Sequence, residues 1–568
     1  MTTEALTERP RLLAGGTARG PVLACEEGLS FWGGVDPDTG VIIDAHHPDH
    51  GASVAGKILL MPTSRGSCSG SGVLLQLSLS GLAPAALVFC EREEVLTLGA
   101  LVSERVFERP LTVLQLPRPL YDLLAQAEVA EIANTTLTID NHTVQLFRVS
   151  TDDLDLSDAD HALLSGDAGE AARLAMEVLC LMAAADGADS LVDVTRGHID
   201  GCILAHDANL IFAEKMAELG GRVSLPTTIN AISVDRENWQ MQGVPAEFGK
   251  RASRLADAYV AMGARPTFTC APYLLADPPR EGEMIGWSES NAVLYANSVL
   301  GARTPKHPDY LDLFIAMTGR APATGVYTDA GRRARRVLEI VAPRTVEDES
   351  FWPVVGWLAG LRSPDQIPLL VGLEHLNPSG DDMKALCAAF ATTSGAPMLH
   401  IAGHTPEASL PPMLDAVRRQ ITPRDLAAAW HELNRGRREI DLVAIGSPHA
   451  SVAEVRRIAE LFSGRQCAPK TSMVVTIGRD VLRAAVAEGL VERLSGARAR
   501  LIPDLCWCSI TEPVFPPGTR GLMTNSGKYA HYAHGLSGLH ARIGGLVDCV
   551  EAAVTGFAPD NPPGWLEM

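Results

Sequence analysis

The feature that most constrains the fold is an alternation of short apolar strands with amphipathic helices in the second part of the chain. Apolar residues recur at helical spacing in 168–183, 208–219 and 452–462. Strand-like runs lie around them, at 190–194, 222–225, 369–372, 397–401, 442–445, 472–477 and 500–503. Strands separated by helices usually pair in parallel, because each helix returns the chain to the same edge of the sheet. We therefore expect an α/β region of several layers with parallel sheets.

The first 150 residues follow a different pattern. Short β-like runs alternate there with glycine and proline turns, at 20–25, 40–44, 57–60, 86–89, 112–116 and 143–147. The acidic segment 150–158 marks a polar boundary. Because 568 residues exceed what one core usually supports, we expect a small β-rich domain over 1–150 and a larger region over 151–568.

The segment 61–76, Met-Pro-Thr-Ser-Arg-Gly-Ser-Cys-Ser-Gly-Ser-Gly-Val-Leu-Leu-Gln, joins a predicted strand at 57–61 to a predicted helix at 73–79. A glycine-serine loop before a helix is typical of an anion-binding turn, since free N–H groups and the helix dipole face the ligand. Arg65 adds positive charge and Ser67 a hydroxyl group. The loop lacks the Gly-Lys-Ser/Thr ending of a nucleotide-binding loop. A purely structural glycine-rich turn is the alternative.

Composition excludes several classes of partner. The net charge of −20 argues against non-specific nucleic-acid binding and against an anionic membrane surface. The N-terminus is acidic without an apolar signal core, and the longest apolar stretch, 174–185, is too short to span a bilayer. Eleven cysteines are spread along the chain, and only Cys506 and Cys508 are close in sequence. We expect a cytoplasmic protein with reduced thiols and a small-molecule substrate.

Six predicted strand ends are followed by polar loops. Ligands bind beyond the carboxyl ends of parallel strands, so chemistry is expected there. The loops are 195–202, 226–230, 267–273, 446–449, 504–508 and 524–529. Taken singly, His198 and His449 have an ordinary structural interpretation, as does each buried cysteine.

Several of these segments together resemble the aconitase X family: Gly197-His-Ile-Asp-Gly201, Pro226-Thr-Thr-Ile-Asn230, Thr269-Cys-Ala-Pro-Tyr273, Trp287-Ser-Glu-Ser-Asn-Ala292, Ala296-Asn-Ser-Val-Leu-Gly-Ala-Arg303 and Thr524-Asn-Ser-Gly-Lys528. The loop at 64–71 resembles that of the family's small swivelling domain. The two resemblances cover nearly the whole chain in the fused order of bacterial members. They imply an aconitase-like α/β fold, a hinged swivelling domain and an active site in the cleft between them.

The resemblance implies a hydro-lyase. Bacterial members resemble cis-3-hydroxy-L-proline dehydratases, so the expected reaction is dehydration of that imino acid to Δ1-pyrroline-2-carboxylate. Alternatives are dehydration of another hydroxy acid, aconitate-like or phosphomevalonate-like, and a non-catalytic iron–sulfur sensor. A plain scaffold explains none of the polar loops.

The resemblance also assigns the catalytic base to Ser67. Its alkoxide needs strong local stabilisation, which Arg65 and the N–H groups of the loop offer. In the competing interpretation Ser67 only binds substrate and Lys528 or His198 moves the proton.

Iron activates the leaving hydroxyl in this family, as an iron–sulfur cluster, with [2Fe–2S] preferred to [4Fe–4S], or as mononuclear iron. Cys270 and Cys506 match family ligand positions. Archaeal relatives carry a cysteine where this chain has Ser447, so the third ligand is open: Cys202 is preferred and Cys508 is the alternative. For the substrate carboxylate the cationic and polar partners expected are Lys528, Arg65, Thr227, Thr228, Asn230, Asn297 and Ser447. The sequence does not determine the oligomeric state.

Overall fold

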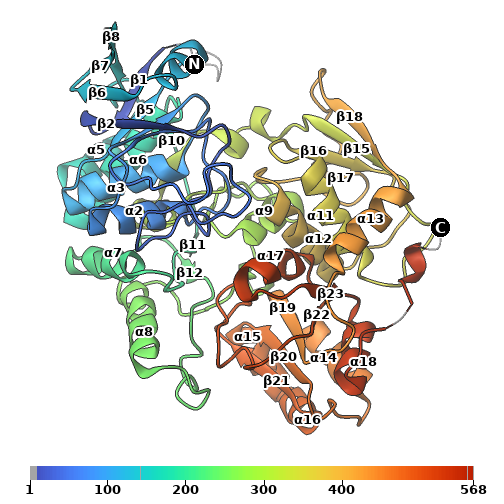
Figure 1. Cartoon of the computed structure of the whole chain (residues 1–568). Helices are drawn as coiled ribbons and strands as arrows, with labels where there is room; N and C mark the ends of the chain where they lie inside the picture. The colour runs from blue at the N-terminus through green and yellow to red at the C-terminus, as the bar shows by residue number, and fades with distance from the viewer. Residues whose placement is uncertain (1–8, 141, 560, 567–568) are drawn as a thin grey trace. The chain divides into compact units, whose positions relative to one another are not determined.

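The computed structural model describes residues 9–140, 142–559 and 561–566 (Figure 1). The N-terminal stretch 1–8, where we expect no signal core, lies outside them. The chain divides into two compact units. Unit 1 contains residues 1–227, 257–264 and 307–328, and unit 2 contains 228–256, 265–306 and 329–568. None of the described helices combines the length and hydrophobicity needed to cross a bilayer.

Unit 1 begins with a nine-stranded sheet of order β8-β7-β6-β2-β3-β4-β5-β1-β9. Its strands are β1 (Arg11–Ala14), β2 (Thr17–Ala24), β3 (Ile58–Leu60), β4 (Ala86–Phe89), β5 (Thr112–Gln115), β6 (Val129–Ala133), β7 (Thr136–Ile139), β8 (His142–Gln145) and β9 (Phe147–Arg148). The four central strands, β2 to β5, run in parallel. Helices α2 (Gly70–Ser80), α3 (Val95–Phe107) and α4 (Arg118–Leu124) connect or follow them. The carboxyl ends of β2 to β5 therefore meet at one edge.

The rest of unit 1 is mostly helical. It contains α5 (Asp158–Ser165), α6 (Glu170–Ala185), β10 (Leu191–Asp193), β11 (Gly197–Ile199), α7 (Asp207–Glu218), α10 (Leu311–Thr318), β14 (Arg320–Pro322) and η2 (Gly325–Tyr327). Helix α6 packs against α3 and α10, and α2 packs against α7. β12 (Thr227–Ile229) and α8 (Ala246–Ala261) lie where the chain passes between the units.

Unit 2 holds two parallel sheets. The first has the order β17-β16-β15-β18. Its strands are β15 (Arg336–Ile340), β16 (Pro368–Val371), β17 (His400–Ile401) and β18 (Val417–Ile421). Around it lie η1 (Pro272–Leu274), β13 (Gly286–Trp287), α9 (Ser290–Ser298), η3 (Ala330–Arg332), α11 (Phe351–Arg362), α12 (Gly380–Thr393) and α13 (Pro423–Leu433).

The second sheet of unit 2 has the order β21-β20-β19-β22-β23, again all parallel. Its strands are β19 (Leu442–Ala450), β20 (Ser472–Ile477), β21 (Ala499–Pro503), β22 (Leu522–Thr524) and β23 (Ala541–Ile543). The connecting helices are α14 (Val452–Phe462), α15 (Arg479–Ala487), α16 (Leu490–Gly496), α17 (Gly527–Ser537) and α18 (Leu546–Thr555), followed by η4 (Gly564–Leu566). The apolar faces of α14, α15, α16 and α18 form one core with the strands. Helix α17 packs in a separate core with other strand residues.

These sheets confirm the predicted α/β class and most of the predicted strands and helices. Two strand predictions are wrong. Residues 222–225 form no strand, because the N–H groups of Val223 and Ser224 donate to Met262 and Ala316 carbonyls outside any sheet. Residues 40–44 make only isolated pairs, Val41 with Ser53 and Ile42 with Val35. Both segments have strand-like composition but no continuous neighbouring strand to pair with.

Candidate functional site

Ser67 lies in unit 1, in the loop that joins β3 to α2. Its side chain is half-buried, and its Oγ accepts a hydrogen bond from the Ser69 N–H at 3.3 Å. Helix α2 begins three residues later, after Ser69, which makes no side-chain cap. Gly66 has φ of 90°, and a Cβ there would lie 2.3 Å from Ser30 Oγ. The loop therefore needs glycine at 66, and it holds Ser67 beside the positive end of a helix.

A carboxylate group that the sequence did not single out lies next to Ser67. The Cys68 thiol donates to Asp200 Oδ2 at 3.3 Å. Cys68, Asp200 and Asp309 each place a ligand-type atom within 4.8 Å of the others. Asp200 belongs to the Gly-His-Ile-Asp-Gly segment, but only folding brings it to the serine loop.

The other predicted catalytic residues of unit 1 differ in environment. Arg65 is exposed and forms an ion pair with Glu27 at 2.8 Å. His198 is completely buried in β11, and burial lowers its pKa to about 3. His198 is therefore neutral at physiological pH and a weak base.

Three thiols meet in unit 2. Ala231, Cys270 and Cys506 form a small buried cluster, and Cys508 packs against it. Hydrogen bonds from Cys270 and then Cys508 to Cys506 lower the pKa of Cys506 well below its ordinary value. Burial raises the pKa of Cys270, and the hydrogen bond to Cys506, followed by burial, raises that of Cys508. This arrangement favours the thiolate form of Cys506.

A buried ion pair accompanies the thiols. Lys528, in the first turn of α17, donates from Nζ to Glu289 Oε1 at 2.8 Å. Burial opposes its charged form, yet Glu289 and the nearby Cys506 keep the pKa of Lys528 well above its ordinary value. Glu289 caps α9 by accepting from the Ala292 N–H. Asn291 follows it and donates to the Cys270 carbonyl at 2.9 Å. Glu289 and Asn291 stood in a segment that carried the resemblance, but the sequence assigned neither a role.

His449 connects the two cysteine loops. Its Nε2 lies 2.6 Å from the Leu505 carbonyl, so Nε2 carries the proton and donates. Its Nδ1 lies 3.1 Å from Thr269 Oγ1, and its backbone N–H donates to Cys270 Sγ at 3.3 Å. Burial lowers its pKa, which keeps it neutral. His449 is thus a structural histidine that holds the Cys270 and Cys506 loops in position.

Arg479 supports the same two loops from α15. It forms an ion pair with the buried Asp504 at 2.6 Å, two residues before Cys506. Its guanidinium also lies 4.8 Å from the ring centroid of Phe268, two residues before Cys270. One side chain therefore braces both cysteine loops.

Apart from Arg65 and Lys528, the predicted substrate-binding residues are all buried. Thr227 is in unit 1 and donates to the Leu225 carbonyl at 3.0 Å, whereas Thr228 and Asn230 are in unit 2. Ser447 lies inside β19, and its carbonyl accepts from Ser526 Oγ. Asn297 donates to the Thr304 and Pro397 carbonyls and accepts from the Thr304 N–H and from Arg332. Because other protein groups already form these hydrogen bonds with the Asn297 amide, its surroundings are those of a structural residue.

Cys202, the preferred third ligand, belongs to unit 1. Its thiol donates to the Ile199 carbonyl at 3.3 Å. The thiol that unit 2 itself adds to Cys270 and Cys506 is Cys508. In an extended segment the Cys-Trp-Cys spacing places both thiols on one side. Here residues 507–509 form a turn, closed by the Ser509 N–H to the Cys506 carbonyl at 2.8 Å, and the turn brings Cys508 to the group.

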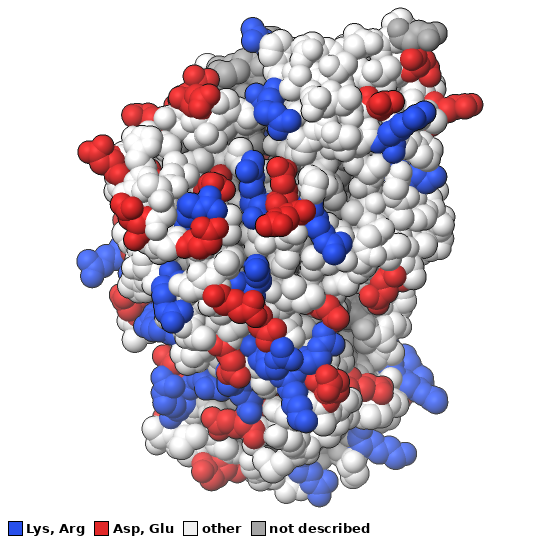
Figure 2. Space-filling view, turned by 90° about the vertical axis from the view of Figure 1, so that its left-hand side faces the viewer, with Lys and Arg blue, Asp and Glu red and all other residues white. Residues whose placement is uncertain are grey.

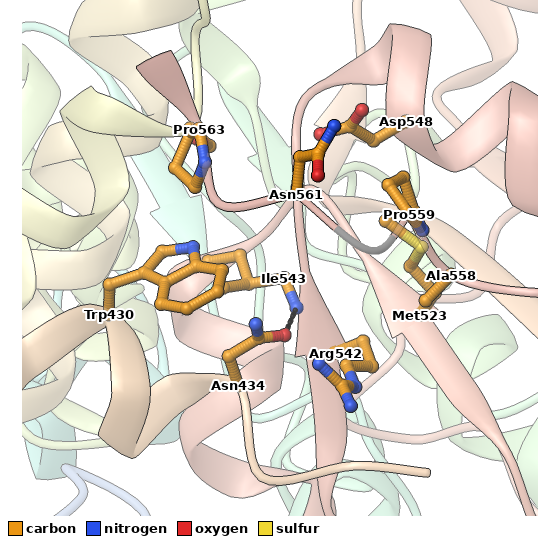
Figure 3. A pocket seen from close by; sticks show the side chains of 12 residues that line it. Trp430, Asn434, Met523, Arg542, Ile543, Asp548, Ala558, Pro559, Asn561 and Pro563 are labelled. Atoms are coloured by element: carbon orange, nitrogen blue, oxygen red, sulfur yellow. Dashed lines mark hydrogen bonds between the residues drawn. The ribbon is translucent and has the colours of Figure 1, made fainter. Parts of the chain in front are cut away.

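An open hollow lies elsewhere in unit 2 (Figure 3). Its walls include Trp430, Asn434, Arg542 and Asp548, and Asn434 Oδ1 accepts from the Ile543 N–H at 3.1 Å. None of the site residues predicted from the sequence lines it, so it is distinct from the thiol group. The surface in Figure 2 mixes basic and acidic side chains without one dominant sign, as expected for a protein that does not bind polyanions on that face.

Four domain models of one family match consecutive parts of the chain. They are the aconitase X swivel domain at 7–145, first domain at 153–330, second domain at 334–431 and third domain at 440–555. The chain belongs to the aconitase X family.

Curated relatives extend over the same length. The chain is 47% identical to the cis-3-hydroxy-L-proline dehydratase of Pseudomonas aeruginosa over 98% of both chains. It is 45% identical to the protein of that name from Hypocrea jecorina, over 97% of this chain and 96% of the relative. The phosphomevalonate dehydratase large subunit of Methanothermobacter thermautotrophicus is more distant, at 31% over 68% of this chain and 95% of the relative.

A solved structure supports the fold. The crystal structure of Thermococcus kodakaraensis aconitase X in its holo form matches with a TM-score of 0.64 and 29% identity, over 70% of this chain and all of that one. The aconitase-like α/β class predicted from the sequence is confirmed.

Proposed function

We propose that this aconitase X protein is a hydro-lyase that dehydrates cis-3-hydroxy-L-proline to Δ1-pyrroline-2-carboxylate. The observation that carries the proposal is the 47% identity to a dehydratase of that name over 98% of both chains. The phosphomevalonate dehydratase relative aligns with only 68% of the chain.

Loss of water next to a carboxylate requires removal of the α proton, departure of the hydroxyl group and stabilisation of the developing charge. We assign proton removal to Ser67. The start of α2 supplies positive potential to an alkoxide there. His198 is a poor candidate for the base because its pKa is about 3. Lys528 is also a poor base, because its pairing with Glu289 favours the protonated form.

The donor set of unit 2 fits iron. Thiolates are the ligands that iron–sulfur centres prefer. Cys270, Cys506 and Cys508 bring three sulfur atoms together, and their surroundings lower the pKa of Cys506. We propose these three as the metal ligands, with Cys508 in place of Cys202. The centre, a [2Fe–2S] cluster or alternatively a [4Fe–4S] cluster or mononuclear iron, supplies Lewis acidity toward the leaving hydroxyl.

The remaining residues position the cysteine loops and offset the negative charge of the thiols. Lys528 places a buried ammonium beside the thiols, where it offsets negative charge on them. Asn291 fixes the Cys270 carbonyl, and His449 ties the Cys270 loop to Leu505. For substrate binding we retain Arg65, Thr227, Thr228, Asn230 and Ser447, and we assign Asn297 to the structure.

A reducing compartment such as the cytoplasm suits this assignment. None of the eleven cysteines, all of them among the described residues, forms a disulfide, and a thiolate-ligated iron centre is preserved under reducing conditions. The substrate is a small imino acid, and the proposal requires no nucleic acid or membrane.

The test is turnover by protein purified without oxygen. We expect conversion of cis-3-hydroxy-L-proline to a cyclic imine, detected with an aldehyde reagent or by reduction to proline. Iron and sulfide analysis with EPR then defines the centre. Iron-loaded protein that leaves this substrate unchanged but dehydrates phosphomevalonate would contradict the proposal and support the second substrate.

A further inference from the structure

Unit 1 contains a second group of metal-ligand side chains, outside the short motifs that resemble the aconitase X family. Cys25 Sγ, a ring nitrogen of His47 and a carboxylate oxygen of Asp49 all lie within 4.8 Å of one another. Cys25 is 3% exposed and His47 is 7% exposed. Asp49 is half-buried and gives the group access to solvent.

The topology explains why the group forms. Cys25 directly follows β2, at the edge where the parallel strands β2 to β5 end. Tyr121 comes from α4, which follows β5 at the same edge. His47 and Asp49 come from 25–57, a segment between β2 and β3 without any named helix or strand (Figure 1). Ligand sites typically form at this end of parallel strands.

Two buried polar atoms at this edge have no hydrogen-bond partner among the described residues: His47 Nε2 and Tyr121 Oη. An unsatisfied buried polar atom costs free energy, so its retention needs an explanation. The other ring nitrogen, His47 Nδ1, faces Asp49. It lies 3.7 Å from Oδ2 and accepts from the Asp49 N–H at 3.2 Å.

We propose that Cys25, His47 and Asp49 bind a divalent zinc-type metal ion, with water at the fourth position. Thiolate, imidazole and carboxylate together are a zinc donor set, whereas calcium and magnesium prefer oxygen ligands alone. The ligand atoms of one tetrahedral zinc ion lie roughly 3–4 Å apart, a spacing that small rotations of these side chains reach. Binding releases the Cys25 proton, since the thiolate is the ligand.

The ion has a structural consequence for the Ser67 loop. The segment that begins at Cys25 contacts that loop directly. Glu27 forms the ion pair with Arg65, the Arg65 N–H donates to the Leu29 carbonyl at 3.2 Å, and Ser30 pairs with Arg65 as an isolated bridge. An ion that joins the start of this segment to His47 and Asp49 therefore braces one wall of the Ser67 loop.

The test measures metal content in full-length protein. Because we also assign metal binding to Cys270, Cys506 and Cys508, every variant carries Cys506→Ser as a common background. After equilibration with excess zinc sulfate and removal of free ions, we expect Cys25→Ser and His47→Gln to retain one zinc per chain fewer than Cys180→Ser. Cys180 is the matched control, since it is a buried cysteine of the same unit on α6.

Cobalt substitution provides a second readout in the same background. The Cys180→Ser protein is expected to show a thiolate-to-cobalt charge-transfer band that Cys25→Ser lacks. Should Cys25→Ser fail to fold, as judged by circular dichroism, Asp49→Asn replaces it because Asp49 is only half-buried. We expect Asp49→Asn to weaken zinc binding by at least about tenfold. Equal zinc content and equal cobalt spectra in all of these variants would overturn the proposal.

Discussion

The two cysteine groups of this protein place the same side chain in opposite electrostatic surroundings. In unit 2, hydrogen bonds from Cys270 and Cys508, together with the charge of Lys528, lower the pKa of Cys506. In unit 1, burial and the neighbouring Asp49 carboxylate raise the pKa of Cys25. The surroundings of Cys506 therefore favour the thiolate, whereas those of Cys25 favour the neutral thiol.

This difference separates two uses of cysteine. A preformed thiolate with a buried counter-cation suits a reactive centre, because little reorganisation is needed when charge develops. A neutral thiol beside an imidazole and a carboxylate suits a structural ion, whose binding energy becomes folding energy. Burial alone does not distinguish them, since both cysteines are at least 97% buried.

The largest effect is expected from Cys506→Ser. Removing the central thiolate should abolish iron binding and lower kcat by about 10⁴-fold, since Lewis acidity accounts for several kcal/mol of barrier lowering. Iron analysis and steady-state kinetics measure this. Cys467→Ser, a buried cysteine of unit 2 outside the thiol group, is the matched control. If Cys202→Ser loses iron while Cys508→Ser keeps it, the ligand assignment is wrong.

Ser67→Ala tests the chemistry that unit 1 contributes. We expect kcat to fall by about 10³-fold, the usual range for loss of a general base, while substrate affinity changes little. Kinetics and isothermal titration calorimetry separate the two quantities. Ser80→Ala, an exposed serine at the other end of α2, should behave like the wild type. Normal turnover by Ser67→Ala would remove Ser67 from the mechanism.

Lys528→Met tests whether Lys528 and Glu289 of unit 2 are energetically coupled as a buried ion pair. The substitution leaves Glu289 buried without its cation and should destabilise the protein by about 3 kcal/mol. The double variant with Glu289→Gln should recover part of that stability without recovering activity. Chemical denaturation followed by circular dichroism gives the free energies of unfolding of the single and the double variant. Additive losses in the double variant would show that the two side chains are not coupled.

The dependence of stability on pH tests a buried neutral side chain of unit 1. Burial lowers the pKa of His307 in unit 1 to about 3, against 6.5 when it is unfolded. Between these values the unfolded chain binds more protons, so stability is lost as the pH falls from 6.5 toward 3. At pH 5 the loss from this group is about 2 kcal/mol relative to pH 7.

His307→Gln should therefore flatten the fall in stability between pH 7 and pH 5, because glutamine does not titrate. It can still hydrogen-bond Tyr327, the partner of His307 at 3.0 Å. His142→Gln, at an exposed histidine of the same unit, is the control. An unchanged pH profile in His307→Gln would place the acid sensitivity elsewhere.

Local patterns predicted much of the fold because helix and strand periodicity depends on neighbours in sequence. The helix at 452–462 and the strand at 472–477 match α14 and β20 in their bounds. The prediction failed at 222–225, where strand-like residues have their N–H groups bonded to distant carbonyls. Hydrogen-bond partners of that kind lie outside any local window.

The sequence by itself determined the α/β class, the family and the polar loops that hold the candidate residues. Only the tertiary structure decided which of those residues meet. It grouped Cys508 with Cys270 and Cys506, paired Lys528 with Glu289 and gave Asn297 a structural environment. The physical reason is that side-chain neighbours and burial set pKa values and metal-binding groups, and both depend on segments far apart along the chain.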